Sequence, residues 1–318
     1  MQIQWSIIWS VNLLCRLVTL TVFFVPLGMF LPVAYFWSTF REYWWRCAIW
    51  LVQRSGPTFI KLGQWASTRR DIFSKEFCDR MSILHTKTTF RQWNLSQFAL
   101  DDLFGDRRWQ KFIVSVQSDP VGSGCIAQVY KGVVDVHKFE EITGIDVPFA
   151  KSRYLTVAIK VAKEGVRERI AIDLSILRAA VRLVQIVLPG LMYVDPVSCL
   201  NQFEEVLKLQ VDLRNEARAL KRFSNNFDPV KTGVRFPQVL CYSRDVIIET
   251  HETGIYINRL VTDEHLMKEK SAVKKKVALI GARTLLKMIF VDNFVHGDLH
   301  PGNILVRFIV GHFLLRHF

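Results

Sequence analysis

The sequence is poor in cysteine, and its six cysteines stand singly along the 318 residues. No two of them form a Cys-x-x-Cys pair, which speaks against a structural zinc site. Their isolation also speaks against a disulfide framework, so we interpret them as reduced, buried thiols. They are Cys15, Cys47, Cys78, Cys125, Cys199 and Cys241.

Charge is almost absent from residues 1–40, where Arg16 is the only charged side chain. As a helix, the uncharged run from Leu17 to Trp37 would reach about 30 Å, the thickness of the hydrocarbon layer of a bilayer. Six of the nine tryptophans flank it, as interfacial anchors do. We therefore predict a membrane anchor over 1–40 with a transmembrane candidate at 17–37. Pro26 and Pro32 predict a kink or break and leave a pair of buried or interfacial helices as the alternative.

Acidic residues are also in deficit, since 42 lysines and arginines face 29 aspartates and glutamates, a formal net charge of +13. This balance suggests an anionic partner such as phosphate, nucleotide or an acidic membrane surface. Nucleic acid is not expected, because the basic residues are scattered and no recognition motif accompanies the densest run, 274–276. The chain start lacks a basic n-region and a run of arginines, so no secretory or transit peptide is predicted.

The stretch from Phe294 to Val306 turns from apolar to polar and back, which is typical of a loop between a helix and a buried strand. Asp298 and Asn303 lie five positions apart. This spacing matches the kinase catalytic loop, where an Asp orients or deprotonates the acceptor hydroxyl and an Asn holds magnesium. Gly302 would let the backbone fold tightly enough for both. The alternative is a plain surface turn, because Pro-Gly-Asn is also turn chemistry.

The same loop differs from that of kinases acting on Ser, Thr or Tyr. Gly297 and His300 stand where those enzymes usually have Arg and Lys. The loop therefore resembles two other groups. One is the small-molecule phosphotransferases, such as aminoglycoside and choline kinases, and the other is the UbiB or aarF-domain atypical kinases.

Upstream, a change of hydrophobic period predicts strands rich in β-branched residues. The three predicted strands are 111–116, 127–131 and 155–161. Between the first two, Gly122 and Gly124 would let backbone N–H groups approach a phosphate, although Gly-x-Gly alone is more often a hairpin turn. On the third, Lys160 ends Val-Ala-Ile-Lys, where a kinase fold puts the lysine that clamps the α- and β-phosphates.

Two long helices are predicted next, at 163–188 and 197–223. On the second, Asp212 and Glu216 are four residues apart and would face the same way. Either could pair with Lys160, as the helix-borne Glu of a kinase does. The alternative is a charged, solvated helix face.

Further strands at 235–242 and 246–249 would complete a five-stranded lobe. Thr250 to Gly254 would then be the hinge beside the adenine of a bound nucleotide. A helix at about 269–291 would lead into the Asp298 loop. Nearer the N-terminus, a helix from Pro57 to Thr68 would put Lys61 and Gln64 on one face. From the residues alone, that pair is an ordinary solvated helix edge, and a second helix is predicted at 95–103.

Four features in order resemble the UbiB/aarF-domain atypical kinase family over about residues 55–306. They are Lys61-Leu-Gly-Gln64, the glycine loop with Val157-Ala-Ile-Lys160, Asp212-Leu-Arg-Asn-Glu216 and His296-Gly-Asp-Leu-His-Pro-Gly-Asn303. The helical Lys-x-Gly-Gln motif discriminates, because aminoglycoside-type kinases lack it. Details of 55–71, of 122–130 and of Asp212-Leu-Arg are similar to the mitochondrial branch called aarF domain-containing kinase 2.

The resemblance implies an α+β, protein-kinase-like fold with an N-terminal helical Lys-x-Gly-Gln extension at 41–110. An N-lobe with inserted helices would follow at 111–254, and a partial C-lobe with the catalytic loop at 255–318. The resemblance also implies a nucleotide, ATP or ADP, with Mg²⁺ as cofactors. It implies a mitochondrial membrane location, contact with membrane lipid and with coenzyme Q biosynthesis proteins, and a role in coenzyme Q or mitochondrial lipid metabolism.

The site residues that the resemblance implies fall into three roles. Asp298 would be catalytic and Asn303 would hold the metal. The cofactor would be bound by the glycine loop, by Lys160 with Glu216 as its partner, by Asp212, and by a helix covering the nucleotide site. The members of this set are Gly122, Gly124, Lys160, Glu216, Asp212, Lys61 and Gln64.

Three departures from the family pattern qualify the expected activity. Gln210 replaces the Glu of the family's Glu-x-Asp, and Gly122 and Gly124 occupy a loop that is usually alanine-rich. No acidic residue follows Asp298, so the Asp-Phe-Gly metal ligand is missing, and 307–318 is predicted to be an unrelated or prematurely ended tail of a truncated C-lobe. We therefore expect a family kinase or ATPase that is weak or inactive in this form. The alternatives are a catalytically dead nucleotide- or lipid-binding module and a small-molecule phosphotransferase.

Overall fold

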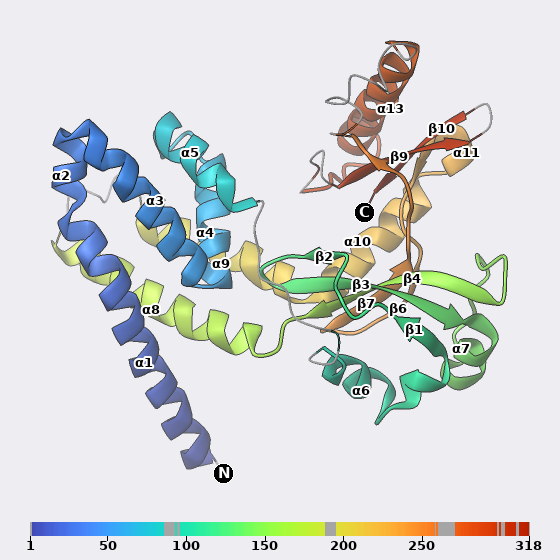
Figure 1. Ribbon diagram of the computed structural model, residues 1–318, viewed down its shortest axis with the longest axis horizontal. Coiled ribbons are helices and arrows are strands. Elements are labelled where there is room, and N and C mark those ends of the chain that lie inside the picture. Colours follow the sequence, from blue (N-terminus) through green and yellow to red (C-terminus); the bar gives the residue numbers. More distant parts are fainter. Residues whose placement is uncertain are drawn as a thin grey trace. The chain divides into compact units, whose positions relative to one another are not determined.

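The computed structural model describes residues 2–85, 93, 96–187, 195–257, 259, 271–297, 299, 303–309 and 312–317. The chain divides into two compact units (Figure 1). One, here called the helical unit, comprises Met1–Phe90, Ser123–Gln128 and Ala162–Val211. The other, the sheet unit, comprises Arg91–Gly122, Val129–Val161 and Asp212–Phe318. Of the helices expected as N-lobe insertions, 163–188 and the part of 197–223 up to Val211 fall in the helical unit, whereas the rest of 197–223 falls in the sheet unit. The domain limits proposed from the sequence stay a prediction.

The helical unit is organised around α4 (Pro57–Thr68), which contacts α3, α5, α8 and α9. Prolines lie in the first turns of α2 and α4, where the missing N–H leaves no helical hydrogen bond unmade. Apolar side chains of Ile60 on α4 and Phe203 on α9 belong to one core cluster of the unit. The other elements are α1 (Gln2–Met29), α2 (Leu31–Phe36), α3 (Ser38–Arg54), α5 (Lys75–Met81), the 3-10 helix η1 (Ser82–His85), α8 (Val166–Val187) and α9 (Pro196–Val211).

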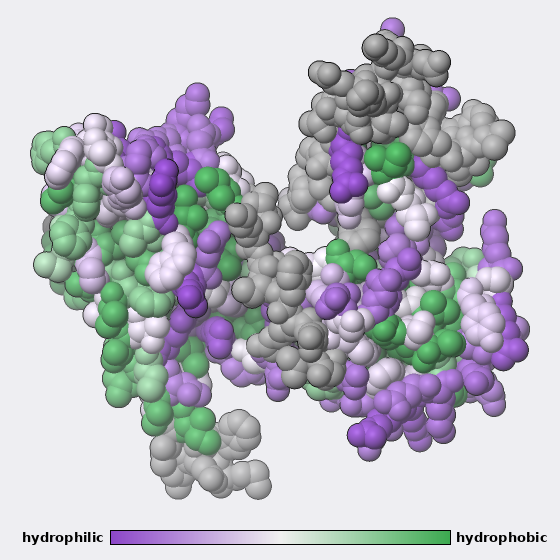
Figure 2. All heavy atoms as spheres, viewed as in Figure 1, coloured by the Kyte–Doolittle hydropathy of each residue, from purple (hydrophilic) through white to green (hydrophobic). Residues whose placement is uncertain are grey.

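The apolar N-terminal run forms α1 and α2. The expected interruption does not fall at Pro26, which lies inside α1, but after Met29. Within the described residues, Ile8–Phe36 is long and apolar enough to cross a membrane by length and composition. Leu20 of α1 is buried in the helical core, whereas Val18 and Val22 are exposed. Figure 2 shows hydrophobic side chains gathered along this helix.

The single charge of the run is enclosed within the helical unit. The Arg16 guanidinium lies on Asp173 of α8, with Nε 2.6 Å from Oδ1 and Nη2 3.1 Å from Oδ2. Asp173 is fully buried, and Arg16 also donates to the backbone oxygen of Ser55 at the end of α3. Arg16, the one charged residue of the apolar N-terminal run, therefore joins α1 to α3 and α8.

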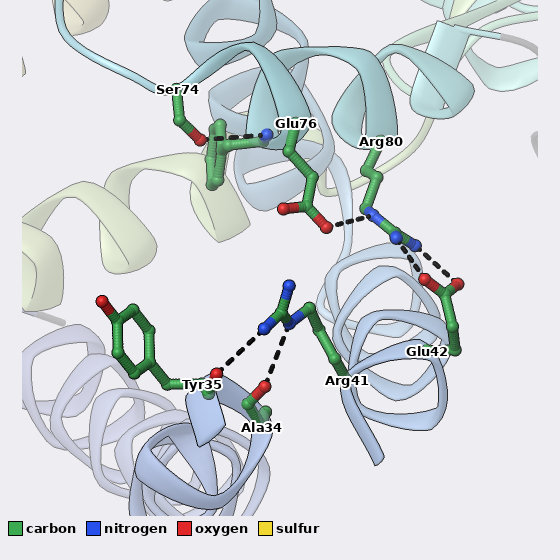
Figure 3. Close-up of polar contacts among 8 residues, drawn as sticks. Ala34, Tyr35, Arg41, Glu42, Ser74, Glu76 and Arg80 are labelled. Carbon is green, nitrogen blue, oxygen red and sulfur yellow. Dashed lines mark hydrogen bonds and ion pairs between the residues drawn. The ribbon is translucent and has the colours of Figure 1, made fainter. Parts of the chain in front are cut away.

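Charged side chains close the corner between α2, α3 and α5, as Figure 3 shows. Arg41 of α3 donates to the carbonyl oxygens of Ala34 (3.1 Å) and Tyr35 (2.9 Å), which the end of α2 leaves without helical partners. Arg80 of α5 joins Glu42 of α3 and, at 3.1 Å, Glu76 of its own helix. The α3 helix that packs on the apolar run thus carries ionised groups beside it.

The sheet unit contains a six-stranded sheet of order β1-β3-β4-β7-β6, with β2 paired to β3. The stretch predicted as one strand at 235–242 is divided, because β6 joins this sheet and β5 joins another. The sheet packs on a core that includes Tyr130, Phe112 and Phe139, all fully buried. Its strands are β1 (Ile113–Val116), β2 (Gly122–Ser123), β3 (Ala127–Asp135), β4 (Tyr154–Ala162), β6 (Val239–Tyr242) and β7 (Val246–Thr250).

The second sheet has the order β5-β10-β9-β8. The segment 307–318, predicted to be an unrelated or prematurely ended tail, contributes strands to this sheet, because β10 pairs antiparallel with β9 and parallel with β5. Its relation to the family stays a prediction. The strands are β5 (Val234–Arg235), β8 (Ile255–Tyr256), β9 (Ile304–Ile309) and β10 (His312–His317). The other elements of the unit are α6 (Phe98–Phe104), the 3-10 helix η3 (Arg108–Lys111), α7 (Val136–Thr143), α10 (Leu213–Asn226), α11 (Pro229–Thr232) and α13 (Ser271–Phe290).

The helix predicted at 197–223 is wrong in one respect, because it is two helices. α9 ends at Val211 and α10 begins at Leu213, with Asp212 between them in an extended conformation, φ −95° and ψ 101°. The Asp212 carboxylate accepts the backbone N–H of Arg214, so it caps α10. Asp212 and Glu216 therefore do not share a helix face.

The cysteines meet the predicted burial only in part. Cys78, Cys125 and Cys241 are buried, but Cys15 and Cys47 are exposed. The last two lie on α1 and α3, on the exposed sides of these helices, so a free cysteine was wrongly taken as a sign of burial there.

Candidate functional site

The first predicted feature of the site is the ion pair between Lys160 and Glu216 in the sheet unit. Lys160 Nζ lies 2.6 Å from Oε1 and 2.8 Å from Oε2 of Glu216. Lys160 is held on β4 opposite Ile247 of β7, and Glu216 lies in the first turn of α10. Both side chains remain partly exposed, at 26% and 40%. The pair therefore fixes an ammonium group that a ligand can still reach.

Asp212, the other acid considered as a partner of Lys160, is engaged elsewhere. The Arg214 guanidinium lies 2.9 and 2.6 Å from its two oxygens, and hydrogen bonding to Arg214 lowers the pKa of the Asp212 carboxyl. This carboxylate is thus both a helix cap and half of an ion pair. Of the two acids, the structure brings only Glu216 to Lys160, and the cofactor-binding role of Asp212 stays a prediction.

The glycine loop is a closed hairpin between β2 and β3. The Val121 N–H donates to the oxygen of Val129 at 2.9 Å, and the Gly124 N–H donates to the oxygen of Ala127 at 2.8 Å. The Gly124 N–H is therefore occupied by the turn. A Cβ at Gly124 would meet only the Ala127 oxygen, at 3.4 Å, so space alone does not require glycine here. Phosphate binding by Gly122 and Gly124 stays a prediction.

The Lys-x-Gly-Gln motif lies on α4 of the helical unit, where two of its residues hold η1. A Cβ at Gly63 would lie 2.3 Å from Cδ1 of the buried Leu84, so only glycine allows this approach without a shift. The Gln64 side-chain amide donates to the Leu84 oxygen at 3.0 Å. The observed contact of Gln64 is thus structural, and its role toward a cofactor stays a prediction.

Lys61 lies on the same helix, half-buried, and its charge acts on Cys125 of the glycine loop. Burial raises the pKa of the Cys125 thiol, and the positive charges of Lys61 and Lys163 oppose the rise. Cys125 also belongs to the same core cluster as Ile60, the neighbour of Lys61 in sequence. Within the helical unit, Lys61 and the Cys125 end of the glycine loop are therefore neighbours.

Part of the catalytic loop lies outside the described residues, including Asp298. The segment before it contacts α10, where the Phe223 ring lies 4.6 Å from that of Phe294, tilted by 39°, and 5.7 Å from that of His296, between ring centroids. Phe223 follows Glu216 by seven residues, or about two turns, so both lie on one face of α10. One helix thus carries the partner of Lys160 and the support of the predicted catalytic loop.

Asn303, the predicted metal ligand, is half-buried just before β9. No group of three or more His, Cys, Asp or Glu side chains that could hold a metal ion occurs among the described residues. A single amide oxygen is a poor site for Mg²⁺, which favours carboxylate and phosphate oxygens. The described residues therefore do not by themselves form a magnesium site.

Glu249 on β7 was missed as a site residue by sequence reasoning. Burial raises the pKa of its carboxyl to about 8, the charges of Glu216 and Glu252 add to the rise, and the charge of Lys160 opposes it. A signal was present in the sequence, because Glu249 follows directly on the apolar run Val246 to Ile248 of its strand, two residues beyond the position opposite Lys160. A third ionisable group, Glu249, therefore lies beside the Lys160–Glu216 pair.

Comparisons with known proteins agree on one kind of domain. The family model described as the ABC1 atypical kinase-like domain matches residues 149–312, just over half of the chain. An ABC1 family mitochondrial protein of Saccharomyces cerevisiae is 28% identical over 318 residues, covering 96% of this chain and 48% of the relative. Its counterpart in Schizosaccharomyces pombe, also named mitochondrial, is 30% identical over 313 residues, covering 92% and 44%.

Bacterial proteins and a solved structure extend this likeness. A probable protein kinase UbiB of Vibrio atlanticus is 25% identical over 258 residues, covering 80% of this chain and 43% of the relative. The Mycobacterium tuberculosis protein Rv3197, solved with erythromycin, is similar in structure with a TM-score of 0.50 and 21% identity, covering 81% of this chain and 58% of that one. The chain spans less than half the length of these curated relatives.

Proposed function

The chain belongs to the ABC1 atypical kinase-like family and has its kinase-like fold, and we propose that it binds ATP or ADP and acts as a kinase or ATPase of that family. The observation that carries this proposal is the partly exposed Lys160–Glu216 ion pair. In kinases the corresponding lysine holds the α- and β-phosphates while a helix-borne Glu orients it. The finer assignment to the aarF domain-containing kinase 2 branch stays a prediction.

Lys160 is suited to a polyphosphate for a physical reason. Its ammonium group has three N–H donors, and the two oxygens of Glu216 take up part of this capacity. Hydrogen bonds between an ammonium and phosphate oxygens are charge-assisted and about twice as strong as neutral ones. Glu216 fixes the direction of the ammonium before a ligand arrives, so less entropy is lost on binding.

Calorimetric titration of the purified chain with ATP tests this proposal. We expect the parent to bind and Lys160→Ala to weaken binding at least about tenfold, because a charged hydrogen bond contributes about 1.5–3 kcal/mol. Lys138→Ala is the matched control, since Lys138 is an exposed lysine on α7 of the same unit. Equal affinities of the parent and Lys160→Ala would contradict the site.

Turnover is proposed separately, through Asp298 as the group that orients or deprotonates the acceptor. Asn303 is the only metal ligand that we expect in the 318 residues, so their magnesium-dependent ATP hydrolysis should be weak. Comparison with Asp298→Ala measures it. Hydrolysis by the parent far above the variant would reveal a metal ligand that we have not recognised.

We further propose a mitochondrial membrane location with lipid contact, in support of coenzyme Q or mitochondrial lipid metabolism. Two relatives carry the word mitochondrial in their names, and Ile8–Phe36 has the length and composition of a span. Alkaline carbonate extraction should leave the protein in the pellet. Val18→Lys with Val22→Lys, both on the exposed side of α1, should weaken retention, whereas full release of the parent would contradict attachment.

A further inference from the structure

Glu249 lies beside Lys160 on one face of the six-stranded sheet. Lys160 faces Ile247 across the β4–β7 ladder, and Glu249 faces Ala158, so the two charged residues are diagonal neighbours. Side chains two residues apart on a strand point to the same face, and diagonal pairs are within reach of long side chains. Helix α10, which carries Glu216, contacts β7. Glu249 therefore lies where the sheet meets the Lys160–Glu216 pair.

One oxygen of the Glu249 carboxyl is buried without a hydrogen-bond partner among the described residues. This oxygen is Oε2, although the residue as a whole is partly exposed. Its strand neighbours Ile247 and Ile248 are fully buried. A buried carboxylate without a counter-ion or hydrogen-bond donor is costly, so this group holds its proton well above the ordinary pH range of a glutamate.

The charges around Glu249 favour the neutral acid. Glu216 faces it from α10 and Glu252 from the segment after β7, while Lys160 on β4 supplies the only positive charge, within the described part of the chain, that acts on its pKa. Glu252 is itself buried, accepts a hydrogen bond from Thr250 at 3.1 Å, and lies 3.9 Å from Arg235. An ionised Glu249 would thus be a further carboxylate competing for the ammonium of Lys160.

We propose that Glu249 is a positioning residue of the nucleotide site that acts through Lys160: its neutral form lets the Lys160 ammonium hold a nucleoside polyphosphate, and its ionised form competes for that ammonium. When ionised, Glu249 is a second counter-ion for the ammonium and adds negative charge where phosphates must approach. The proposal rests on the proposed nucleotide-binding function and names a proton as its regulator.

The sign and size of the pH effect follow from linkage. With the Glu249 pKa near 8, the acid is mostly neutral at pH 7 and mostly ionised at pH 9. If ATP binds only the neutral form, the dissociation constant rises about tenfold between these pH values. Binding would also return a proton to Glu249, with an uptake of about 0.8 proton per ATP at pH 8.5.

The test is calorimetric titration with ATP at pH 7 and pH 9 of the parent and three variants. Glu249→Gln keeps the shape of the neutral acid, so it should bind ATP as the parent does at pH 7, and its dissociation constant should not rise at pH 9. Glu249→Ala should also lose the rise. Glu141→Gln, the same change on an exposed glutamate of α7, is the control and should behave as the parent. The ionisation of ATP is common to all and cancels.

Proton uptake by the parent at pH 8.5, measured in buffers of different ionisation enthalpy, tests the inference even if the variants do not fold. Three results would overturn the inference: an ATP dissociation constant of the parent that does not change between pH 7 and pH 9, an equal rise of that constant in Glu249→Gln, or no proton uptake. Absence of an isotherm in every variant and in the parent would instead reject nucleotide binding itself, and the inference with it.

Discussion

The two units each contain an ion pair at a helix, and the pairs differ in enclosure. In the helical unit, Arg16 and Asp173 are 17% and 0% exposed and are further bound to the end of α3. In the sheet unit, Lys160 and Glu216 are 26% and 40% exposed. A pair whose carboxylate is fully buried holds helices together, whereas a pair in which water reaches both side chains can exchange one partner for a ligand. The comparison separates an ion pair that holds helices together from one to which we assign a role in nucleotide binding.

The largest expected effect comes from breaking the enclosed pair. Arg16→Leu leaves Asp173 buried without a counter-ion, and this should lower the free energy of unfolding of the helical unit by about 3–5 kcal/mol. Denaturant unfolding of the chain in detergent measures it. Arg70→Leu is the control, because Arg70 pairs with Asp79 at the surface and such pairs contribute about 0–1 kcal/mol. Adding Asp173→Leu to Arg16→Leu should recover most of the loss, and no recovery would contradict the account.

A smaller effect is expected from Glu249, with a defined pH dependence. The unfolded chain releases this proton near pH 4.5, the ordinary pKa of a glutamate, whereas the folded chain keeps it to about pH 8. The folded state therefore binds more protons between these values, so stability falls as pH rises through them, by about 2–4 kcal/mol. Glu249→Gln should remove this fall, as urea unfolding at pH 5, 6.5 and 8 would show. Equal slopes in parent and variant would contradict the raised pKa.

The smallest stability change is expected at the cap of α10. Asp212→Ala removes the acceptor of the Arg214 N–H and should cost about 1 kcal/mol, whereas Asp212→Asn should retain most of the cap. Thermal unfolding compares the two. A loss of ATP binding in Asp212→Asn, with the cap retained, would assign Asp212 to the cofactor site after all.

Sequence patterns predicted the parts of the site that depend on local periodicity. The alternation around Val157 to Val161 placed Lys160 on a strand, and the helical spacing placed Glu216 on a helix, so their pairing could be foreseen as one of two options. The break at Asp212 was missed, although the apolar spacing changes there: Leu207 and Val211 are four residues apart, as are Leu213 and Ala217, but Val211 and Leu213 are only two apart. The extended backbone at Asp212, which its capping hydrogen bond stabilises, shows that the stretch is two helices.

Other features depend on tertiary packing and were beyond sequence reasoning. The close approach of Leu84 to Gly63 joins residues about twenty positions apart, and nothing local signals it. The burial of the Glu249 carboxyl depends on strand neighbours and on α10, which lies about thirty residues earlier in the chain. The ion pair of Arg16 and Asp173 spans 157 residues, so neither partner identifies the other.

The contrast between the two ion pairs is tested most directly by thermal unfolding with and without ATP in the parent, Lys160→Ala and Arg16→Leu. Binding of ATP at about one hundred times its dissociation constant should raise the melting temperature of the parent by about 5 °C. Lys160→Ala should melt within about 2 °C of the parent and lose the ATP shift. Arg16→Leu should melt well below the parent and keep the shift. A lost shift in Arg16→Leu, or a retained one in Lys160→Ala, would contradict the account.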